Sequence, residues 1–231
     1  FDPLTGIVGT TPSNPATGAV SMDINDLDIG TGDNIVVVAT DGGDYVYMYD
    51  IDEAAAIALF WTNEITVNPS SLPGAECNAV DINTNATFVA VGCSTSPYLH
   101  VWAITNGGAG TPSWSSKSSA PAGGNIPSGV ITGIEFSPDG SHIAIVTDTS
   151  PYLEVYPFSA GAIGTKISTT ALPGAGTGVA WLTENTSGPT NLATSHAVGP
   201  YLTVYNFNTL TGVFGTKLDD PSPALGSATS S

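Results

Sequence analysis

The chain has 231 residues, with 20 acidic residues, three lysines and no arginine, so its formal net charge is −17 at pH 7. That charge disfavours nucleic acid and anionic membranes as partners, and no apolar run reaches the roughly twenty residues that span a bilayer. Aliphatic runs such as Ile35–Val38 recur along the chain, which excludes a disordered protein.

The N-terminal segment repeats a segment near the C-terminus. Residues 1–10 align without a gap on residues 207–216, at an offset of 206 residues that corresponds to four internal repeats. We therefore expect residues 1–17 to form an outer strand whose three partner strands are absent. A fragment of a longer repeat protein explains this arrangement; alternatively, the strand pairs with another blade or another subunit.

One aromatic and β-branched string occurs four times along the chain. Its copies start at Tyr45, Tyr98, Tyr152 and Tyr201, at intervals of 53, 54 and 49 residues. Three copies follow a Ser-Pro or Gly-Pro pair, which breaks the chain before an alternating run that is typical of a strand. Each copy therefore predicts one β-strand.

Three further strand-like runs accompany each copy. Two precede it, at about 20–25, 78–83, 133–137 and 178–183 and at about 34–40, 87–93, 142–147 and 191–196, and a weaker one follows, at 57–62, 112–117, 162–166 and 213–217. This pattern predicts an all-β fold, a β-propeller of four-stranded antiparallel blades, with about four blades plus one extra outer strand. Residues 1–231 then form a single propeller domain or fragment, with approximate repeats at 1–17, 18–74, 75–127, 128–175 and 176–231.

The third repeat carries a family resemblance. Residues 133–146, which contain the tight turn Ser-Pro-Asp-Gly, resemble the first hairpin of WD40-like propeller repeats. Their continuation at residues 150–158 resembles the WD40-like repeats found in tailed-phage virion proteins and environmental phage sequences. The Gly-His and Trp-Asp signatures of WD40 repeats are missing. The resemblance implies the propeller fold, and propellers host many functions.

The two cysteines flank a predicted hairpin turn. Pairing Asn83 with Thr87 across that turn places Cys77 opposite Cys93, where a cross-strand disulfide could form. A disulfide would imply an oxidising location. The alternative is two buried thiols that act as small apolar residues.

Two glycosylation sequences fall in equivalent predicted turns of two repeats, each between the first and second strands. They begin at Asn85 and Asn185, and a glycan would be exposed at either position. Two such sequences also arise by chance in a chain this rich in Asn and Thr.

Three acids, Asp23, Asp81 and Glu135, are interpreted as equivalent residues of the first strands, with Trp181 in the fourth repeat. If that strand lines a central channel, the carboxylates could converge on a cation such as Ca²⁺, which binds oxygen ligands. No other cofactor is indicated. The alternative is that each carboxylate accepts hydrogen bonds from neighbouring backbone or hydroxyl groups.

Three tryptophans, Trp61, Trp102 and Trp114, fall on predicted third or fourth strands. Exposed rings there could stack on sugars or fill a subunit interface. The alternative is that they pack in the core or cover the flank of a blade.

No catalytic motif is visible, because the three histidines are scattered and no nucleophile elbow, metal-binding helix or phosphate loop occurs. We therefore expect a non-enzymatic structural or adhesive module of an extracellular assembly, most simply a phage virion protein of a tail, fibre or capsid surface. Its partners would be other subunits of a virion or filament, with a surface glycan as a further candidate. The alternatives are a secreted, glycosylated repeat protein that polymerises into a surface filament, and a carbohydrate- or ligand-binding propeller.

Overall fold

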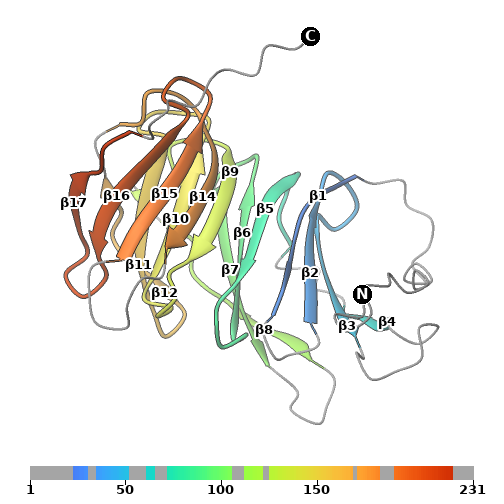
Figure 1. Cartoon of the computed structure of the whole chain (residues 1–231). Coiled ribbons are helices and arrows are strands. Elements are labelled where there is room, and N and C mark those ends of the chain that lie inside the picture. Colours follow the sequence, from blue (N-terminus) through green and yellow to red (C-terminus); the bar gives the residue numbers. More distant parts are fainter. Residues whose placement is uncertain are drawn as a thin grey trace, which may run out of the picture.

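The computed structural model describes residues 23–30, 35–51, 61–65, 72–105, 112–121, 125–168, 171–182 and 190–220. These residues contain no α-helix, and their strands form four antiparallel sheets. The sheets stand side by side in chain order, from blue to red in Figure 1. The predicted all-β fold of antiparallel blades is therefore confirmed, whereas the extra outer strand expected at residues 1–17 lies outside the described residues.

We call the sheets blades 1 to 4 and the first strand of each its inner strand. Blade 1 has the strand order β1-β2-β3-β4, with β1 at Ile24–Ile29, β2 at Ile35–Thr40, β3 at Val46–Ile51 and β4 at Trp61–Ile65. Blade 2 has the order β5-β6-β7-β8, with β5 at Cys77–Ile82, β6 at Phe88–Cys93, β7 at Leu99–Thr105 and β8 at Ser113–Lys117.

Blades 3 and 4 repeat this order. Blade 3 consists of β9 at Ile131–Phe136, β10 at His142–Thr147, β11 at Leu153–Ser159 and an outer strand in two pieces, β12 at Ala162–Ile163 and β13 at Ile167–Ser168. Blade 4 consists of β14 at Gly176–Leu182, β15 at Thr190–His196, β16 at Leu202–Asn208 and β17 at Val213–Lys217. The outer strand of blade 3 is interrupted opposite Pro157, which has no N–H to donate and whose carbonyl accepts the Gly164 N–H at 2.7 Å.

A tyrosine ends the turn between the second and third strands of all four blades, although the turn has a cis peptide bond before proline in blades 2, 3 and 4 and Gly43 with positive φ in blade 1. The tyrosine directly before each third strand has a left-handed backbone, with φ of 65° at Tyr45, 61° at Tyr98 and 68° at both Tyr152 and Tyr201. The backbone N–H of each tyrosine donates to the carbonyl three residues earlier. This conformation is costly for a side chain other than glycine, so its recurrence marks a common structural role for the four residues.

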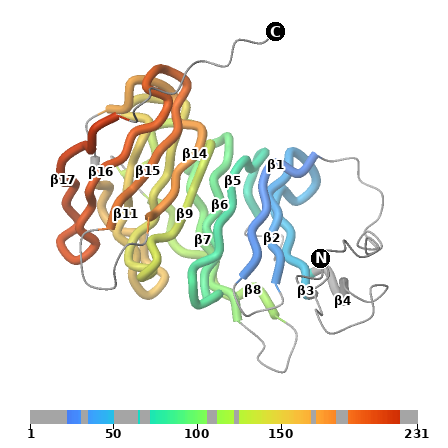
Figure 2. Tube along the Cα trace, in the orientation of Figure 1, coloured from blue at the N-terminus to red at the C-terminus, as the bar shows by residue number. Residues whose placement is uncertain are grey.

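The hydrophobic core lies between the blades, where each inner strand packs on the blade before it. Strand β5 contacts β1 and β2, β9 contacts β5 and β6, and β14 contacts β9 and β10, as the adjoining tubes in Figure 2 show. Three clusters of buried side chains fill the three junctions. We call the face of a blade that points to the next blade its forward face, and the opposite one its rear face.

Candidate interaction surface

Acidic side chains on the inner strands join each blade to the next. Asp28 of β1 accepts the backbone N–H of Ile82 at 2.8 Å, Asp81 of β5 accepts that of Phe136 at 2.7 Å, and Glu135 of β9 accepts that of Trp181 at 2.6 Å. Because these donors all lie on the next inner strand, the three contacts form equivalent links across the three junctions. We call them the carboxylate links.

The sequence-based choice of acids was correct for Asp81 and Glu135 as an equivalent pair and wrong for Asp23. Asp23 precedes β1 and is exposed, and its N–H donates to Asp41 Oδ1 at 2.8 Å. Asp28 is the true equivalent, because it pairs with Val37 as Asp81 pairs with Ala90 and Glu135 with Ala144. By the same register, the residue of blade 4 that is equivalent to Glu135 is Ala180, which lies opposite Ala193, and not Trp181.

The carboxylate links lie in a partly desolvated, negatively charged region. Burial raises the pKa of Asp81 to about 8 and the pKa of Glu135 to about 7, and the charge of nearby Asp28 adds to both shifts. The hydrogen bonds from Phe136 and Trp181 only partly oppose these shifts. Asp81 is therefore largely protonated at neutral pH, and an acceptor for backbone N–H groups is the role that its contacts show.

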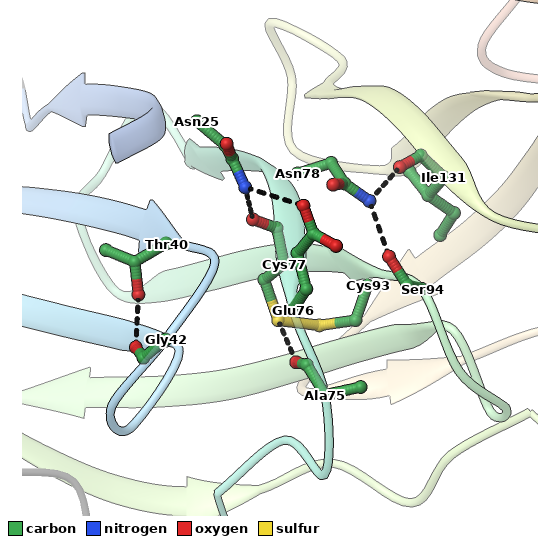
Figure 3. Close-up of a disulfide and its surroundings, with 10 residues drawn as sticks. All are labelled: Asn25, Thr40, Gly42, Ala75, Glu76, Cys77, Asn78, Cys93, Ser94 and Ile131. Carbon is green, nitrogen blue, oxygen red and sulfur yellow. Dashed lines mark hydrogen bonds between the residues drawn. A yellow bond between two sulfur atoms is a disulfide. The ribbon is translucent and has the colours of Figure 1, made fainter. Parts of the chain in front are cut away.

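A second set of links crosses the same junctions. The side chains of Asn25, Asn78 and Thr132 donate to the backbone carbonyls of Cys77 at 3.0 Å, Ile131 at 3.2 Å and Gly176 at 2.7 Å; the first two bonds are drawn in Figure 3. Each donor is the residue at which the pairing of the first two strands shifts by one. Such a bulge re-aims one side chain, here toward the next blade.

The two cysteines form a disulfide that joins β5 to β6 (Figure 3). Cys77 and Cys93 are opposite residues of the two strands and are completely buried in the junction between blades 1 and 2. The residues that match Cys93 in blades 1 and 3 are Thr40 and Thr147. Their hydroxyls instead donate to carbonyls two residues ahead, at 2.9 and 2.7 Å. Cys93 thus occupies a position that threonines hold in blades 1 and 3, whereas Cys77 matches Ile24 and Ile131.

Trp102 and Trp114, the two of these tryptophans whose side chains the structure describes, do not form an exposed platform. Trp102 of β7 is completely buried, with its ring stacked on His100, and the Nζ of Lys117 lies 4.8 Å from its centroid. Trp114 of β8 is half-buried, and its Nε1 donates to the Ile65 carbonyl of blade 1 at 2.9 Å. Trp61 begins β4, and its side chain lies outside the described part. The described rings therefore support the core-packing alternative.

Burial also affects His100. It lowers the pKa of this histidine to about 4, with the charge of Lys117 as a second cause. The Nδ1 of His100 and the Nε1 of Trp102 have no hydrogen-bond partner among the described residues. This neutral, buried pair belongs to the junction between blades 1 and 2.

The two glycosylation sequences differ in what the structure describes. Asn85 is exposed in the turn between β5 and β6, a turn that Asn83 closes by accepting the backbone N–H groups of Thr87 and Phe88, both at 2.8 Å. A glycan on Asn85 would point to solvent. Asn185 lies outside the described residues.

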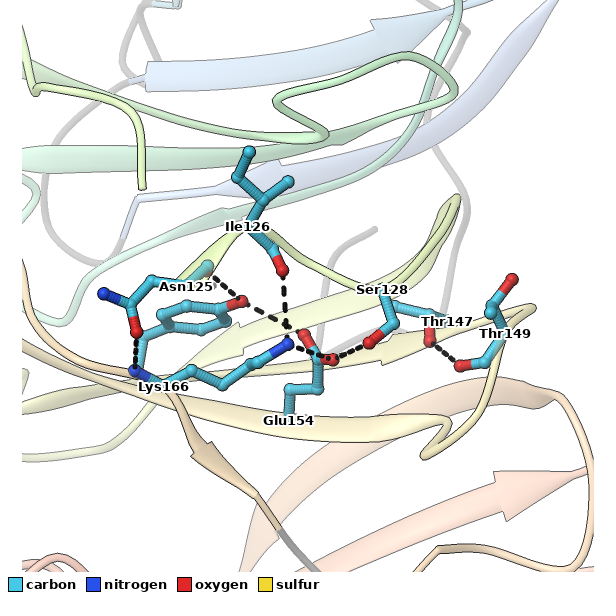
Figure 4. Close-up of polar contacts among 8 residues, drawn as sticks. Asn125, Ile126, Ser128, Thr147, Thr149, Glu154 and Lys166 are labelled. Carbon is cyan, nitrogen blue, oxygen red and sulfur yellow. Dashed lines mark hydrogen bonds and ion pairs between the residues drawn. The ribbon is translucent and has the colours of Figure 1, made fainter. Parts of the chain in front are cut away.

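Glu154 and Lys166 form a buried ion pair that the sequence did not reveal (Figure 4). Glu154 is 0% exposed, and its Oε1 lies 3.0 Å from the Lys166 Nζ and also accepts the Ser128 hydroxyl. The hydroxyl of Tyr156 lies 3.0 Å from the other carboxylate oxygen and 2.9 Å from the Asn125 carbonyl. The network fastens residues 125–128 to blade 3, so Lys166 is a structural residue.

A surface pocket of about 430 Å³ lies beside that network, at the outer edge of blade 3. It is lined by small and uncharged residues, among them Ser119, Pro121, Asn125, Gly161 and Thr165. Within the described ranges, no three His, Cys, Asp or Glu side chains are grouped so that they could hold a metal ion. The residues that line this pocket offer hydrogen-bonding groups but no acidic or basic side chain.

The rear face of the inner strand β1 is uncovered. Ile24, Leu27 and Ile29 are 59%, 54% and 53% exposed. The matching residues are 0–8% exposed in blade 2, where they are Cys77, Val80 and Ile82, and in blade 3, where they are Ile131, Ile134 and Phe136. On the same face Val36, Val38 and Tyr49 are already buried, so the uncovered apolar strip is β1 itself.

The forward face of blade 4 is the second open surface. Along β15 and β16, residues that face blade 3 are buried and alternate with half-buried residues on the forward face. Ala193 is half-buried, whereas Ala90 and Ala144 at the matching place in blades 2 and 3 are 0% exposed. Blades 2 and 3, by contrast, have central strands buried on both faces.

No protein-family model and no curated protein matches the chain. Solved structures do match it. The structure of U3-55K aligns with a TM-score of 0.58 at 10% identity, over 87% of this chain and 52% of that one. The WD40 repeats of RRP9 align with a TM-score of 0.58 at 9% identity, over 87% and 52% of the two chains.

This chain has the fold of WD40-like β-propellers. A third match, hydrazine synthase of Kuenenia stuttgartiensis, has a TM-score of 0.56 at 13% identity, over 89% of this chain and 52% of that one. The chain therefore spans about half the length of these propeller proteins. At such low identity the likeness shows the fold alone, and the matches include an enzyme as well as the WD40 repeats.

Proposed function

We propose that this chain is a non-enzymatic protein-interaction module that serves as a building block of an extracellular assembly. The assembly that we infer is a phage virion, in which the chain contributes to a tail, a fibre or the capsid surface. Its partners are then other protein subunits and not nucleic acid. No helix within the described ranges is long and apolar enough to cross a membrane.

The uncovered apolar strip on β1 carries this proposal. Three large aliphatic side chains stand more than half exposed on one strand, although the same positions in blades 2 and 3 are buried. A contiguous exposed apolar surface marks a protein contact more often than it marks a catalytic centre. A protein surface is therefore the partner that this strip fits best.

The polar groups support a non-enzymatic role. The carboxylates of Asp28, Asp81 and Glu135 bind backbone N–H groups of the next blade. His196 contacts the Val198 carbonyl at 2.6 Å and the Thr203 hydroxyl at 3.0 Å inside blade 4. These contacts stabilise blades and junctions, which supports a structural role for the side chains.

Two observations support the extracellular and virion parts of the proposal. The disulfide between Cys77 and Cys93 suits an oxidising compartment. The continuation of the third-repeat hairpin, at residues 150–158, resembles the WD40-like repeats of tailed-phage virion proteins.

The direct test is to locate the native chain. Particles are purified from the culture medium of the source on a density gradient, and this chain is quantified in every fraction by mass spectrometry with and without reduction. We expect the chain to co-sediment with particles and to carry the disulfide. Recovery only from the cell interior with free thiols, or turnover of polysaccharides by the purified chain, would contradict the proposal.

The second candidate is a secreted, glycosylated repeat protein that polymerises into a surface filament. The exposed position of Asn85 in the turn between β5 and β6 favours it. Intact-mass measurement of the native chain and of an Asn85→Gln variant tests it: the filament candidate requires a glycan that the variant lacks. A native mass with neither glycan nor disulfide would speak against it.

A carbohydrate- or ligand-binding propeller is the third candidate, with the pocket at the outer edge of blade 3 as its site. Its uncharged lining and the buried Trp102 offer little that recognises a sugar. Isothermal titration with a panel of oligosaccharides would revive this candidate if any of them bound.

A further inference from the structure

We propose that Asp28 of β1 and Asp81 of β5 share one proton, and that loss of this proton loosens the junction between blades 1 and 2. The pair joins two different blades, so its protonation state acts on the contact between them and not on the inside of either sheet. This pH-sensitive junction is a property of the fold itself and does not depend on the extracellular assembly proposed above.

The arrangement of the inner strands brings the two carboxyl groups together. Asp28 and Asp81 are equivalent residues of neighbouring inner strands, and β1 contacts β5. The Asp28 carboxyl group accepts the backbone N–H of Ile82, the residue that follows Asp81, at 2.8 Å. This link holds the Asp28 side chain against β5 beside Asp81, and the two side chains are hydrogen-bonded to each other.

A hydrogen bond between two carboxyl groups requires a proton. An ionised carboxylate can only accept, whereas a protonated one has an O–H to donate. Each group also has two oxygens, so Asp81 can accept the Phe136 N–H at 2.7 Å and still share a proton with Asp28. When that proton leaves, the donor of the shared bond is lost and two like charges face each other across the junction.

The strands around Asp81 offer no compensating charge. On β1, Asp26 accepts the Val80 N–H at 3.0 Å, and β9 carries Glu135, so both neighbouring inner strands add only acids. The strands β2 and β6, which also contact β5, contain no ionisable side chain other than the disulfide-bonded Cys93. Burial raises the pKa of Asp81 to about 8, so the proton is retained at neutral pH and lost at moderately alkaline pH.

The first experiment follows the titration of Asp81 by NMR of its side-chain carboxyl carbon. In Asp28→Asn, the amide oxygen can still accept the Ile82 N–H and the amide nitrogen can donate to Asp81, so ionisation of Asp81 no longer places two charges together. We expect the pKa of Asp81 to fall by at least about 1 in this variant. Asp26→Asn is the matched control, because it removes a carboxylate of the same strand that also accepts an N–H of β5. It should change the pKa of Asp81 by less than about 0.5.

The second experiment measures how the junction of the wild-type chain responds to pH. Hydrogen exchange reports the protection of the Ile82 N–H, which crosses the junction, and of the Phe158 N–H, which donates to the Ser141 carbonyl inside blade 3 at 2.7 Å. Both rates are corrected for the intrinsic pH dependence of exchange. Between about pH 7 and about pH 9, the protection of Ile82 should fall roughly tenfold relative to that of Phe158. This fall should be absent in Asp28→Asn.

An Asp81 pKa that is the same in Asp28→Asn and in the wild type would overturn the shared proton, because burial alone would then account for the titration. Equal relative protection of Ile82 at the two pH values would overturn the loosening of the junction. The amide spectrum shows whether Asp28→Asn is folded, and the exchange measurement on the wild-type chain decides the proposal if the variant is not.

Discussion

At the residue scale, the acids of the inner strands act as hydrogen-bond acceptors that couple one blade to the next. Asp81 accepts the N–H of Phe136 while its own pKa is raised to about 8 by burial. A carboxylic acid still has a carbonyl oxygen that can accept this bond. The link therefore survives protonation, and ionisation of the group is what costs free energy.

This coupling predicts how stability depends on pH. Between the ordinary pKa of aspartate and about 8, the folded chain holds a proton on Asp81 that the unfolded chain releases, so ionisation destabilises the fold as pH rises. Asp81→Asn keeps a neutral acceptor at every pH. Its free energy of unfolding should equal that of the wild type near pH 4 and exceed it by about 1–3 kcal/mol at pH 8. Denaturant titrations at both pH values measure the difference, and a variant less stable than the wild type at pH 8 would contradict it.

Lys166 and Lys217 each form an ion pair with an acid, and the two pairs differ in burial. Lys166 pairs with the completely buried Glu154, whereas Lys217 pairs with Asp220 at 2.6 Å on the surface, with both side chains more than 40% exposed. Lys166→Met leaves a buried carboxylate without its cation and should lower the free energy of unfolding by about 3–5 kcal/mol. Lys217→Met is the control and should cost less than about 1 kcal/mol. Equal effects in thermal or denaturant unfolding would mean that the buried pair is not a structural anchor.

At the element scale, small residues let the inner strands approach each other. A Cβ added at Gly133 of β9 would lie 2.9 Å from Val146 Cγ2 and 3.2 Å from Gly178 Cα of β14. Gly178 is the matching residue of blade 4, and its forward side is open apart from the Ser195 hydroxyl. Replacement of glycine by alanine therefore adds a methyl group inside a packed junction at Gly133 and on an open face at Gly178.

The prediction is that Gly133→Ala lowers the free energy of unfolding by about 1–3 kcal/mol, because overpacking forces the two strands apart. Gly178→Ala should leave the stability of the monomer within about 0.5 kcal/mol, since alanine suits a strand at least as well as glycine. Chemical unfolding at a concentration where the chain is monomeric measures both. If Gly178→Ala proved the more damaging change, the description of the forward face as open would be wrong.

At the scale of the whole molecule, a strongly negative net charge is combined with the exposed apolar strip of Ile24, Leu27 and Ile29 on β1. Long-range repulsion between copies with a net charge of −17 opposes association, while burial of the apolar strip of β1 favours it. Added salt screens the first effect and leaves the apolar contact in place.

Association of the wild-type chain should therefore strengthen as salt rises from about 0.01 M to about 0.5 M, over which the Debye length shrinks from about 30 Å to a few ångströms. Sedimentation at the two ionic strengths measures the change. Oligomers that dissociate on addition of salt would instead indicate a contact between charged surfaces and not through the apolar strip of β1.

The sequence by itself determined the grouping of strands into four-stranded blades and the register that places Cys77 opposite Cys93, although it placed the first and fourth strands of blade 1 about four residues too early. These features depend on local signals: the period-two alternation of side chains, the turn residues and the repeat of the Tyr45, Tyr98, Tyr152 and Tyr201 strings. Each can be recognised within one repeat and then checked against the others, which is why the fold could be predicted from the chain alone.

Only the tertiary structure decided which side chains meet. The first strand of blade 1 lies at Ile24–Ile29 and not at about 20–25, where the repeat pattern had placed it, so Asp28 and not Asp23 joins the carboxylate links. The burial of Glu154 with Lys166 depends in the same way on the path of residues 125–128 over blade 3. The exposure of Ile24, Leu27 and Ile29 depends on what packs against β1, because their composition matches that of the buried inner strands.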